Sequence, residues 1–342
     1  MRDDLAPLAR TWQTPSRKAL TMRAAVYRRT GPAAAVFTLE DAPTPEPGPG
    51  EVRVRLRLAG VNPTDWKMRS STEPADFQIP GQDGAGDIDA VGKGVDPGRI
   101  GERVWVWFAA RGRPWGTAAE WTVVPSRQAV QLPDEVSYEQ GASLGIPAMT
   151  AWHCLHVDGA IDGRPVLVAG GAGAVGNAAV ALAHRGGARV VATASTPEKA
   201  ALAESAGADL VVDYRAPDAA ERIRAFAPEG VDRVVEVALG ANLELDLAVV
   251  APHAVVATYA DDRVADLPVR RLMVNNTMLR FVLVYGVADA DLDAAVAGVS
   301  AALADGALPA LPVARYPLDR VAEAHDAVQA GTVGRVLLDL DA

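Results

Sequence analysis

The 342-residue chain contains a single cysteine, Cys154, and this scarcity excludes two kinds of site. One thiol cannot form an intrachain disulfide, and it cannot supply a cysteine-rich metal centre. A chain without disulfides fits a reducing compartment, so we expect a cytoplasmic protein. The N-terminus also lacks the apolar segment of a secretory signal, and Asp3 and Asp4 are atypical of a transit peptide.

Long apolar runs and an excess of basic residues are missing as well. No stretch reaches the roughly 18 uninterrupted apolar residues of a membrane span. The net charge is -10, whereas a general nucleic-acid binder needs clustered lysine and arginine to neutralise phosphates. The sequence therefore predicts neither a membrane protein nor a nucleic-acid partner. Its apolar content, 49% of the residues, is ample for the cores of two globular domains.

The first half of the chain has the pattern of many short strands. Apolar and charged residues alternate strictly from Glu51 to Leu58, which is typical of a strand with one buried face. Prolines between Ala42 and Gly50 predict a loop, and glycine-rich segments recur between the later short runs. This spacing predicts a partly open β-barrel. Residues Met1 to Thr21 show neither period and are expected to form a disordered tail, with the first strand starting at Met22.

From about Ile146 the pattern changes to strands that alternate with helices. We expect strands at 165–169, 189–193, 210–212, 231–237, 254–258 and 281–285, and helices at 175–185, 197–206, 219–226, 243–249 and 289–304. Such alternation predicts an α/β fold with a parallel, doubly wound sheet. After Leu308 the chain returns to strand, helix and strand, ending with an apolar run at 336–340.

A glycine-rich turn is the strongest single motif. It consists of Gly171, Ala172, Gly173, Ala174, Val175 and Gly176, directly after an apolar strand and at the start of a helix. One glycine permits the tight turn, the next lets the backbone approach a pyrophosphate, and the third lets helix and strand pack closely. The phosphates would then lie on free N–H groups at the helix N-terminus. In this context the motif indicates a dinucleotide-binding site.

The end of the second strand of this half favours NADPH over NADH. NAD-binding proteins usually place an acidic residue there to bind the ribose 2′-hydroxyl, but this chain has small hydroxyl residues such as Ser195. Lys199 lies in the first turn of the next helix, where a bound 2′-phosphate would offset its unfavourable interaction with the helix dipole. A solvated lysine is the alternative interpretation. Glu198 argues against NADPH, since it would repel a phosphate.

Several further stretches together resemble the medium-chain dehydrogenase/reductase superfamily, in its zinc-free quinone oxidoreductase branch, the ζ-crystallin-like proteins. They are 61–65, 80–86, 145–151, the glycine-rich turn, 205–209, 212–214 and 333–338. The resemblance runs from about Met22 to Leu340. It implies a GroES-like β-barrel domain at 22–147 and 288–342, and a Rossmann domain at 148–287 inserted before the last segment. It also implies a homodimer that pairs the edge strand Leu279 to Tyr285, an apolar run in need of cover.

The resemblance also implies roles for single residues of the cofactor site. Tyr214 matches a tyrosine near the adenosine end of NADPH, and Lys199 matches a basic residue near the 2′-phosphate. Thr150 matches a residue close to the nicotinamide, and Tyr259 falls where a loop of the family touches the cofactor.

The ligands that hold zinc in metal-dependent members of the superfamily are replaced here. The segment from Gly60 to Asp65 has no cysteine, and Gln82 and Asp83 stand in place of a His-Glu pair. A neutral glutamine is a poor zinc ligand compared with imidazole. His153, Cys154 and His156 cluster in sequence, but their spacing on a helix does not converge on one ion. We therefore expect no metal site.

Without a Lewis acid, an alcohol is not readily polarised for oxidation. The resemblance therefore implies hydride transfer from NADPH to a quinone or related conjugated carbonyl, with protein groups orienting the acceptor and stabilising the developing oxyanion. Asn62 and Lys67 are the candidates for that role, although many family members have a tyrosine near the position of Lys67. Two alternatives stay open: an NADPH-dependent enoyl or enone reductase, such as those of polyketide or secondary metabolism, and a non-catalytic NADPH-binding sensor or structural protein.

Overall fold

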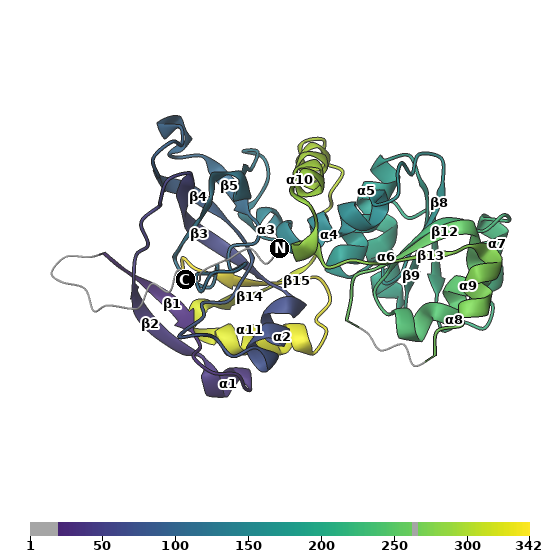
Figure 1. Cartoon of the computed structure of the whole chain (residues 1–342), viewed down its shortest axis with the longest axis horizontal. Helices are drawn as coiled ribbons and strands as arrows, with labels where there is room; N and C mark the ends of the chain where they lie inside the picture. Colours follow the sequence, from purple (N-terminus) through teal and green to yellow (C-terminus); the bar gives the residue numbers. More distant parts are fainter. Residues whose placement is uncertain (1–19, 262–265) are drawn as a thin grey trace, which may run out of the picture.

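The computed structural model describes residues 20–261 and 266–342, and two β-sheets dominate it (Figure 1). The first is seven-stranded, with the order β14-β15-β3-β4-β5-β7 and with β6 also paired to β3. Its strands are β3 (Glu51–Val61), β4 (Asp83–Val91), β5 (Arg103–Val106), β6 (Trp121–Pro125), β7 (Ala129–Gln131), β14 (Val313–Pro317) and β15 (Arg335–Asp339). A two-stranded sheet, β1 (Thr21–Val26) and β2 (Thr38–Pro43), joins it through the bridge between Ala24 and Ala119.

Strand β3 shows why this half folds as a barrel. Val52, Val54 and Leu56 are buried, whereas Arg55 between them is exposed. The alternation expected from the sequence therefore places one face of the strand in the core. The short helices α1 (Ala33–Val36), α2 (Pro63–Ser71), α3 (Tyr138–Gly141) and α11 (Val321–Gln329) belong to this half.

The second sheet has six parallel strands in the order β10-β9-β8-β11-β12-β13. They are β8 (Pro165–Val168), β9 (Arg189–Ala194), β10 (Leu210–Asp213), β11 (Val231–Glu236), β12 (Val250–Thr258) and β13 (Met278–Phe281). The helices of this half are α4 (Gly145–His156), α5 (Ala174–Arg185), α6 (Pro197–Ser205), α7 (Ala219–Phe226), α8 (Leu239–Val249), α9 (Val269–Asn275) and α10 (Asp289–Ala304). This is the strand order of a Rossmann sheet, in which ligands bind beyond the carboxyl ends of the strands.

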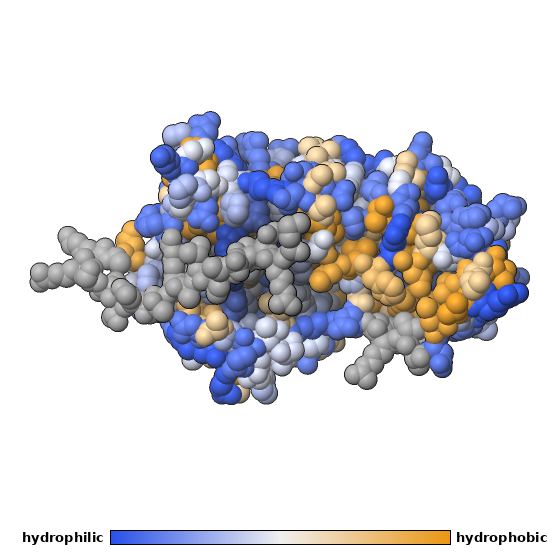
Figure 2. Space-filling view, in the orientation of Figure 1, coloured by the Kyte–Doolittle hydropathy of each residue, from blue (hydrophilic) through white to orange (hydrophobic). Residues whose placement is uncertain are grey.

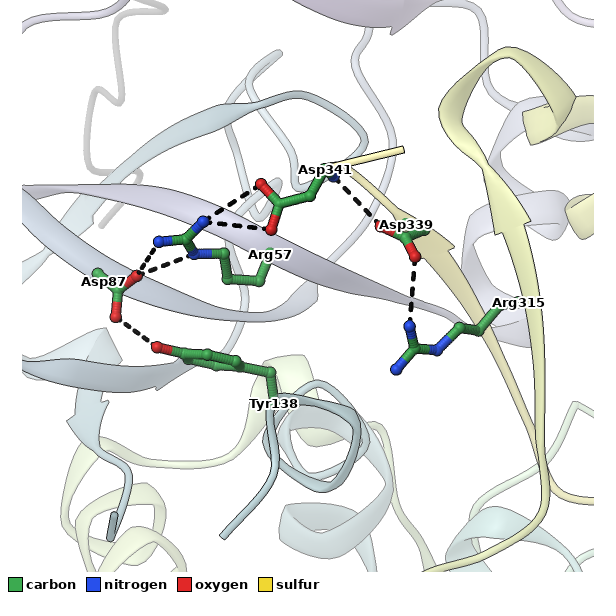
Figure 3. A network of polar contacts seen from close by, with 6 residues as sticks. All are labelled: Arg57, Asp87, Tyr138, Arg315, Asp339 and Asp341. Atoms are coloured by element: carbon green, nitrogen blue, oxygen red, sulfur yellow. Dashed lines mark hydrogen bonds and ion pairs between the residues drawn. The ribbon is translucent and has the colours of Figure 1, made fainter. Parts of the chain in front are cut away.

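The end of the chain returns to the barrel, as expected. β15 pairs antiparallel with β3, and the yellow C-terminal segments lie among the purple N-terminal strands in Figure 1. A polar network stabilises the pairing of the C-terminal segment with the barrel (Figure 3). Arg57 donates hydrogen bonds to Asp87, at 3.0 Å, and to Asp341, at 3.2 Å. Tyr138 donates to Asp87 as well, at 2.5 Å. These bonds connect β3 and β4 to the C-terminal segment after β15.

Several expected boundaries were wrong. The strand expected at 281–285 is β13 at Met278–Phe281, followed by a 3-10 turn at Val284–Gly286. Its partner β12 ends at Thr258, opposite Phe281, so the following apolar residues have no strand to pair with. β12 and α8 begin four residues earlier than expected, at Val250 and Leu239.

At the N-terminus, β2 extends to Pro43, inside the stretch expected to be a loop, because Pro43 faces Thr21 in the two-stranded sheet. The tail expected at 1–21 lies outside the described residues as far as residue 19, and Thr21 already belongs to β1. Within the described ranges, no helix has the length and apolar character needed to cross a membrane.

Candidate functional site

A cleft of about 530 Å³ is lined by elements of both halves of the molecule. One wall consists of residues that follow or end the strands of the six-stranded sheet: Gly170, Thr193, Tyr214, Val237 and Tyr259. The rest of the lining comes from the end of β3, from the start of α4, and from the segment that leads into β15. The cleft thus lies where a doubly wound sheet is expected to bind its ligand.

The glycine-rich turn forms the floor of this cleft between β8 and α5. A Cβ on Gly171 would lie 2.8 Å from the Ala192 side chain, and one on Gly176 would lie 2.2 Å from the Gly170 carbonyl oxygen. Gly173 lines the cleft, and the nearest atom to its Cβ would be 3.4 Å away. Two glycines therefore permit close packing, and the third leaves the backbone open toward the cleft.

The start of α5 also offers donors to this space. Gly173 is the N-cap and has no side chain to bond the first amides, which have no partner within the helix. Ala174 and Val175, the first two helical residues, line the cleft. A helix N-terminus of this kind stabilises negative charge. The turn therefore fits the pyrophosphate of a dinucleotide.

A second group of polar residues lies at the ends of β9 and β10. Ser195, Lys199 and Tyr214 all line the cleft, and Lys199 Nζ lies 3.5 Å from Ser195 Oγ. The Thr196 hydroxyl caps α6 by accepting a hydrogen bond from the Lys199 amide, at 3.3 Å. The same strand supports the glycine turn, because Thr193 Oγ1 accepts from the Gly170 amide at 3.0 Å.

The charge of the cleft suits an anionic ligand. Of the described residues that line it, none is Asp or Glu, whereas Lys199 and Arg335 are cations. Glu198, the residue that argued against a phosphate, is exposed, and hydrogen bonds to its own backbone and to Thr196 lower the pKa of its carboxyl. Glu198 is not part of the cleft wall. These residues fit a nucleotide with an additional 2′-phosphate.

Tyr259 and Thr150 differ in how they meet the cleft. Tyr259 follows β12 and lines the cleft, and its amide donates to the Glu236 carbonyl at 3.2 Å. Burial raises the pKa of its hydroxyl well above the ordinary value. Thr150 is buried within α4 and is not part of the wall, although Ile146 and Pro147, one turn earlier, are.

Asn62 lies at the barrel side of the cleft, at the start of α2. Its backbone amide donates to Asp65 at 2.7 Å, closing the cap of the helix. Its side-chain Nδ2 donates to Asp83 at 2.7 Å, and its Oδ1 accepts from Arg335 at 3.0 Å. The amide is therefore held in one orientation, and its second Nδ2 proton remains for another acceptor.

Two buried carboxyls support Asn62. Burial raises the pKa of Asp65 to about 7, against the effect of the Asn62 amide. Burial also raises the pKa of Asp83, to about 6, while Arg335 and the Asn62 side chain lower it. The barrel end of the site thus contains two acids that titrate near neutral pH.

Lys67 is placed differently from Asn62. It lies on α2, with Nζ 6.0 Å from the centroid of the Trp66 ring, and it does not line the cleft. Gln82, one of the two residues that stand in place of the expected His-Glu pair, accepts a hydrogen bond from the Ala110 amide at 3.2 Å. Among residues 20–261 and 266–342, no three His, Cys, Asp or Glu side chains gather as they would around a metal ion.

Sequence reasoning missed two parts of the wall. Arg335 is 3% exposed, and its Nε and Nη2 atoms have no hydrogen-bond partner among the described residues. The segment that contains Val237, Ala238 and Asn242 also lines the cleft. The sequence contained a signal for each part. Arg335 is a lone arginine at the start of the apolar strand β15, and the segment with Val237 follows the carboxyl end of β11, where ligands of such sheets bind.

Comparisons with known proteins agree with this geometry. A family model described as an alcohol dehydrogenase GroES-like domain matches residues 48–134, and one described as a zinc-binding dehydrogenase matches residues 174–300. The quinone oxidoreductase of Pongo abelii is 30% identical over 286 residues, covering 82% of this chain and 86% of that protein.

Solved structures are similar over nearly the whole chain. A mycobacterial protein in complex with NADPH has a TM-score of 0.80 at 30% identity, covering 93% of this chain and 99% of that one. A cobalt- and zinc-bound thermostable alcohol dehydrogenase from Pyrobaculum aerophilum has a TM-score of 0.76 at 28% identity, with the same coverage of both chains.

Proposed function

The chain belongs to the medium-chain dehydrogenase/reductase superfamily, with quinone oxidoreductases among its relatives, and from this we propose that it transfers hydride from NADPH to a quinone or a related conjugated carbonyl. One observation carries the proposal. The open glycine turn, the Ser195–Lys199 pair and Asn62 line one cleft between the two halves of the molecule. A dinucleotide held there by its phosphates would extend from the Rossmann sheet toward the barrel.

The cofactor residues have separate tasks in this proposal. Gly171 and Gly176 allow β8 and α5 to pack, whereas Gly173, Ala174 and Val175 present backbone N–H groups to the pyrophosphate. Ser195, Lys199 and Tyr214 would bind the adenosine end with its 2′-phosphate. Thr150, one turn behind the wall residues Ile146 and Pro147, would approach the nicotinamide, and Tyr259 would touch the cofactor from the loop after β12. When bound, NADPH supplies the hydride.

The chain's own residues would supply orientation and hydrogen bonding. Asn62 lines the cleft, and Asp83 uses one of its two Nδ2 protons, so we assign the other to a hydrogen bond with the acceptor's carbonyl oxygen, where negative charge develops. Asp83 and Arg335 hold that amide in place. Asn62 and Gln82 present amides, which are poor zinc ligands, and Asp83 is bonded to Asn62. The scheme therefore uses hydrogen bonds in place of a metal.

Lys67 is the second proposed catalytic residue, as a donor to the substrate carbonyl. Its position on α2, one turn beyond Asn62, requires the side chain to leave the Trp66 ring. The test is Lys67→Met, with Lys93→Met, an exposed turn residue, as the matched control. A fall in kcat of about 100-fold for the first variant alone agrees with general-acid catalysis, and unchanged turnover removes Lys67 from the mechanism.

We further propose that the protein forms a homodimer through the edge of the six-stranded sheet. β13 is the outer strand of that sheet, and the segment 279–285 includes the exposed Phe281 and Leu283. Figure 2 shows apolar side chains gathered over this half, where Figure 1 draws α9 and β13, with Met273 and Val274 among the exposed residues. Such a patch on an edge strand needs a cover.

Two broader expectations accompany this function. We propose domain limits of 22–147 with 288–342 for the barrel domain and 148–287 for the Rossmann domain. These limits are supported by the division of the strands between the two sheets. We also propose a cytoplasmic location, which the single, buried Cys154 supports.

The deciding experiment measures oxidation of NADPH, against NADH, with 1,4-benzoquinone, 9,10-phenanthrenequinone and a 2-enone, each with and without a chelator. We expect chelator-insensitive oxidation of NADPH with a quinone. Preference for the enone would assign the protein to alkene reduction. Absence of oxidation with every acceptor, despite stabilisation by NADPH, would overturn the reductase and leave a protein that only binds the cofactor.

A further inference from the structure

Two carboxyl groups contact each other behind the wall of the cleft. Glu236 is the last residue of β11 and Asp246 lies on α8, and their side chains are 0% and 1% exposed. Their carboxyl groups hydrogen-bond to each other. An ionised carboxylate only accepts hydrogen bonds, so this contact requires a proton on one of the two. Two touching ionised carboxylates would repel each other strongly in a buried site.

Glu236 connects this pair to two segments of the wall. Its side-chain Oε1 accepts from the Ala238 amide and, at 2.9 Å, from Asn242 Nδ2. Both of those residues line the cleft. Its backbone carbonyl accepts from the amide of Tyr259, the wall residue after β12. The segment 237–242 therefore takes its position from the Glu236 carboxyl.

The surroundings do not neutralise a second negative charge. The pKa of Glu236 is raised by burial, against hydrogen bonds from Ala238, Asn242 and Val237. The pKa of Asp246 is raised well above its ordinary value by burial and by Glu236. Neither Glu236 Oε2 nor Asp246 Oδ2 accepts a hydrogen bond from any donor among the described residues.

Among the described residues, no cation contributes to the pKa of either carboxyl. From the β12 side, Tyr259 is affected by the charge of Glu236, and Cys154 on α4 acts on Tyr259 in turn. On α8, Glu244 is turned outward and pairs with Arg271 of α9 at 2.6 Å. The shared proton is thus what keeps the two carboxyls together.

We propose that Glu236 is a positioning residue for NADPH: the singly protonated Glu236–Asp246 pair holds the segment 237–242 in its binding position, and loss of the shared proton to solvent at alkaline pH weakens cofactor binding. The inference rests on the proposed function, because it assumes that NADPH occupies this cleft. Neither carboxyl touches the reacting atoms. The pair acts on the affinity for NADPH and leaves hydride transfer itself unchanged.

The test is the dissociation constant of NADPH, measured by fluorescence titration from neutral to alkaline pH for the wild type and Asp246→Asn. An amide at 246 donates to Glu236 at every pH. We expect the wild-type constant to rise about tenfold, equivalent to ~1.4 kcal/mol, while Asp246→Asn stays flat. Glu236→Gln, which keeps an acceptor for Ala238 and Asn242, provides a second variant with the same expected flat profile.

Glu244→Gln is the matched control, since Glu244 lies on the same helix but faces solvent, and it should retain the wild-type profile. In turnover, the KM for NADPH should follow the dissociation constant while kcat at saturating NADPH does not change. Parallel pH profiles for wild type and both pair variants would overturn this inference alone. Failure of the wild type to bind NADPH at any pH would overturn the proposed function as well.

Discussion

Arg335 Nη2 lies 3.7 Å from the Asp83 carboxylate in an ion pair that is almost completely buried, with side-chain exposures of 4% and 0%. The pair joins the first residue of β15 to the first residue of β4, so it connects the end of the chain to the centre of the barrel. Asn62 bonds to both partners and faces the cleft. The same contacts therefore stabilise the fold and orient Asn62, the proposed hydrogen-bond donor to the substrate.

Arg335→Leu should destabilise the protein by about 3–5 kcal/mol, because Asp83 would remain buried without its cation. The free energy of unfolding in urea measures this. The surface control is Arg315→Leu. Arg315 pairs with Glu139 at 2.7 Å but its side chain is 49% exposed, so its loss should matter by no more than about 1 kcal/mol. Equal effects of the two substitutions would contradict the role given to the buried pair.

The double variant Arg335→Leu/Asp83→Asn separates charge from packing. Asparagine removes the unpaired charge and keeps an oxygen for the Ile146 amide, which now donates to Asp83 at 2.8 Å. We expect it to recover a measurable part of the lost stability. No recovery would mean that the guanidinium acts through packing and its bond to Asn62.

Gly176→Ala and Gly173→Ala should fail in different ways. The Cβ at Gly176 would lie 2.2 Å from the Gly170 carbonyl oxygen, a backbone atom, so this substitution should destabilise the fold. The Cβ at Gly173 would have 3.4 Å of clearance and would project from a residue that lines the cleft. Gly173→Ala should therefore keep its melting temperature and bind NADPH more weakly. Thermal unfolding with and without NADPH checks both, and the reverse pattern would contradict the assignment.

Local patterns in the sequence were sufficient to predict most of the fold. The alternation in β3 and the strand–turn–helix around Gly171 depend on neighbouring residues, and the structure confirms both. The end of β13 depended on its partner, because β12 stops at Thr258. Contacts such as Arg335 to Asn62, 273 residues apart, carry no local signal.

The same distinction applies to the site. Ser195 and Lys199 lie four residues apart across a helix start, so the sequence alone brings them together. The Glu236–Asp246 pair could not be predicted, because the contact depends on how α8 packs beneath β11.

Lys199→Ala should weaken the binding of NADPH and leave NADH unchanged. A charged hydrogen bond contributes about 1.5–3 kcal/mol, which corresponds to roughly a 10- to 150-fold rise in the dissociation constant. NADH lacks the 2′-phosphate, so its dissociation constant should not change. Lys199→Arg should retain most of the affinity, and Glu198→Gln, at the exposed neighbouring position, should change it little. Equal losses for both nucleotides would place Lys199 away from the 2′-phosphate.

Asp65→Asn should flatten the dependence of stability on pH. Burial raises the pKa of Asp65 to about 7 in the folded protein, whereas an unfolded aspartate titrates near 3.9. The folded state therefore holds this proton more tightly, so its stabilising contribution is present below about pH 4 and lost as the pH rises toward 7. The loss amounts to at most ~4 kcal/mol. Asparagine at this position has no proton to lose in this range, and its amide oxygen still accepts from the Asn62 backbone.

Urea unfolding at about pH 4 and about pH 8 should show a smaller fall in the free energy of unfolding for Asp65→Asn than for the wild type. Asp134→Asn, at a side chain that is 97% exposed, should follow the wild type. If Asp65→Asn keeps the wild-type slope, the proton is not held at this carboxyl, and Asp83 becomes the group that titrates beneath Asn62.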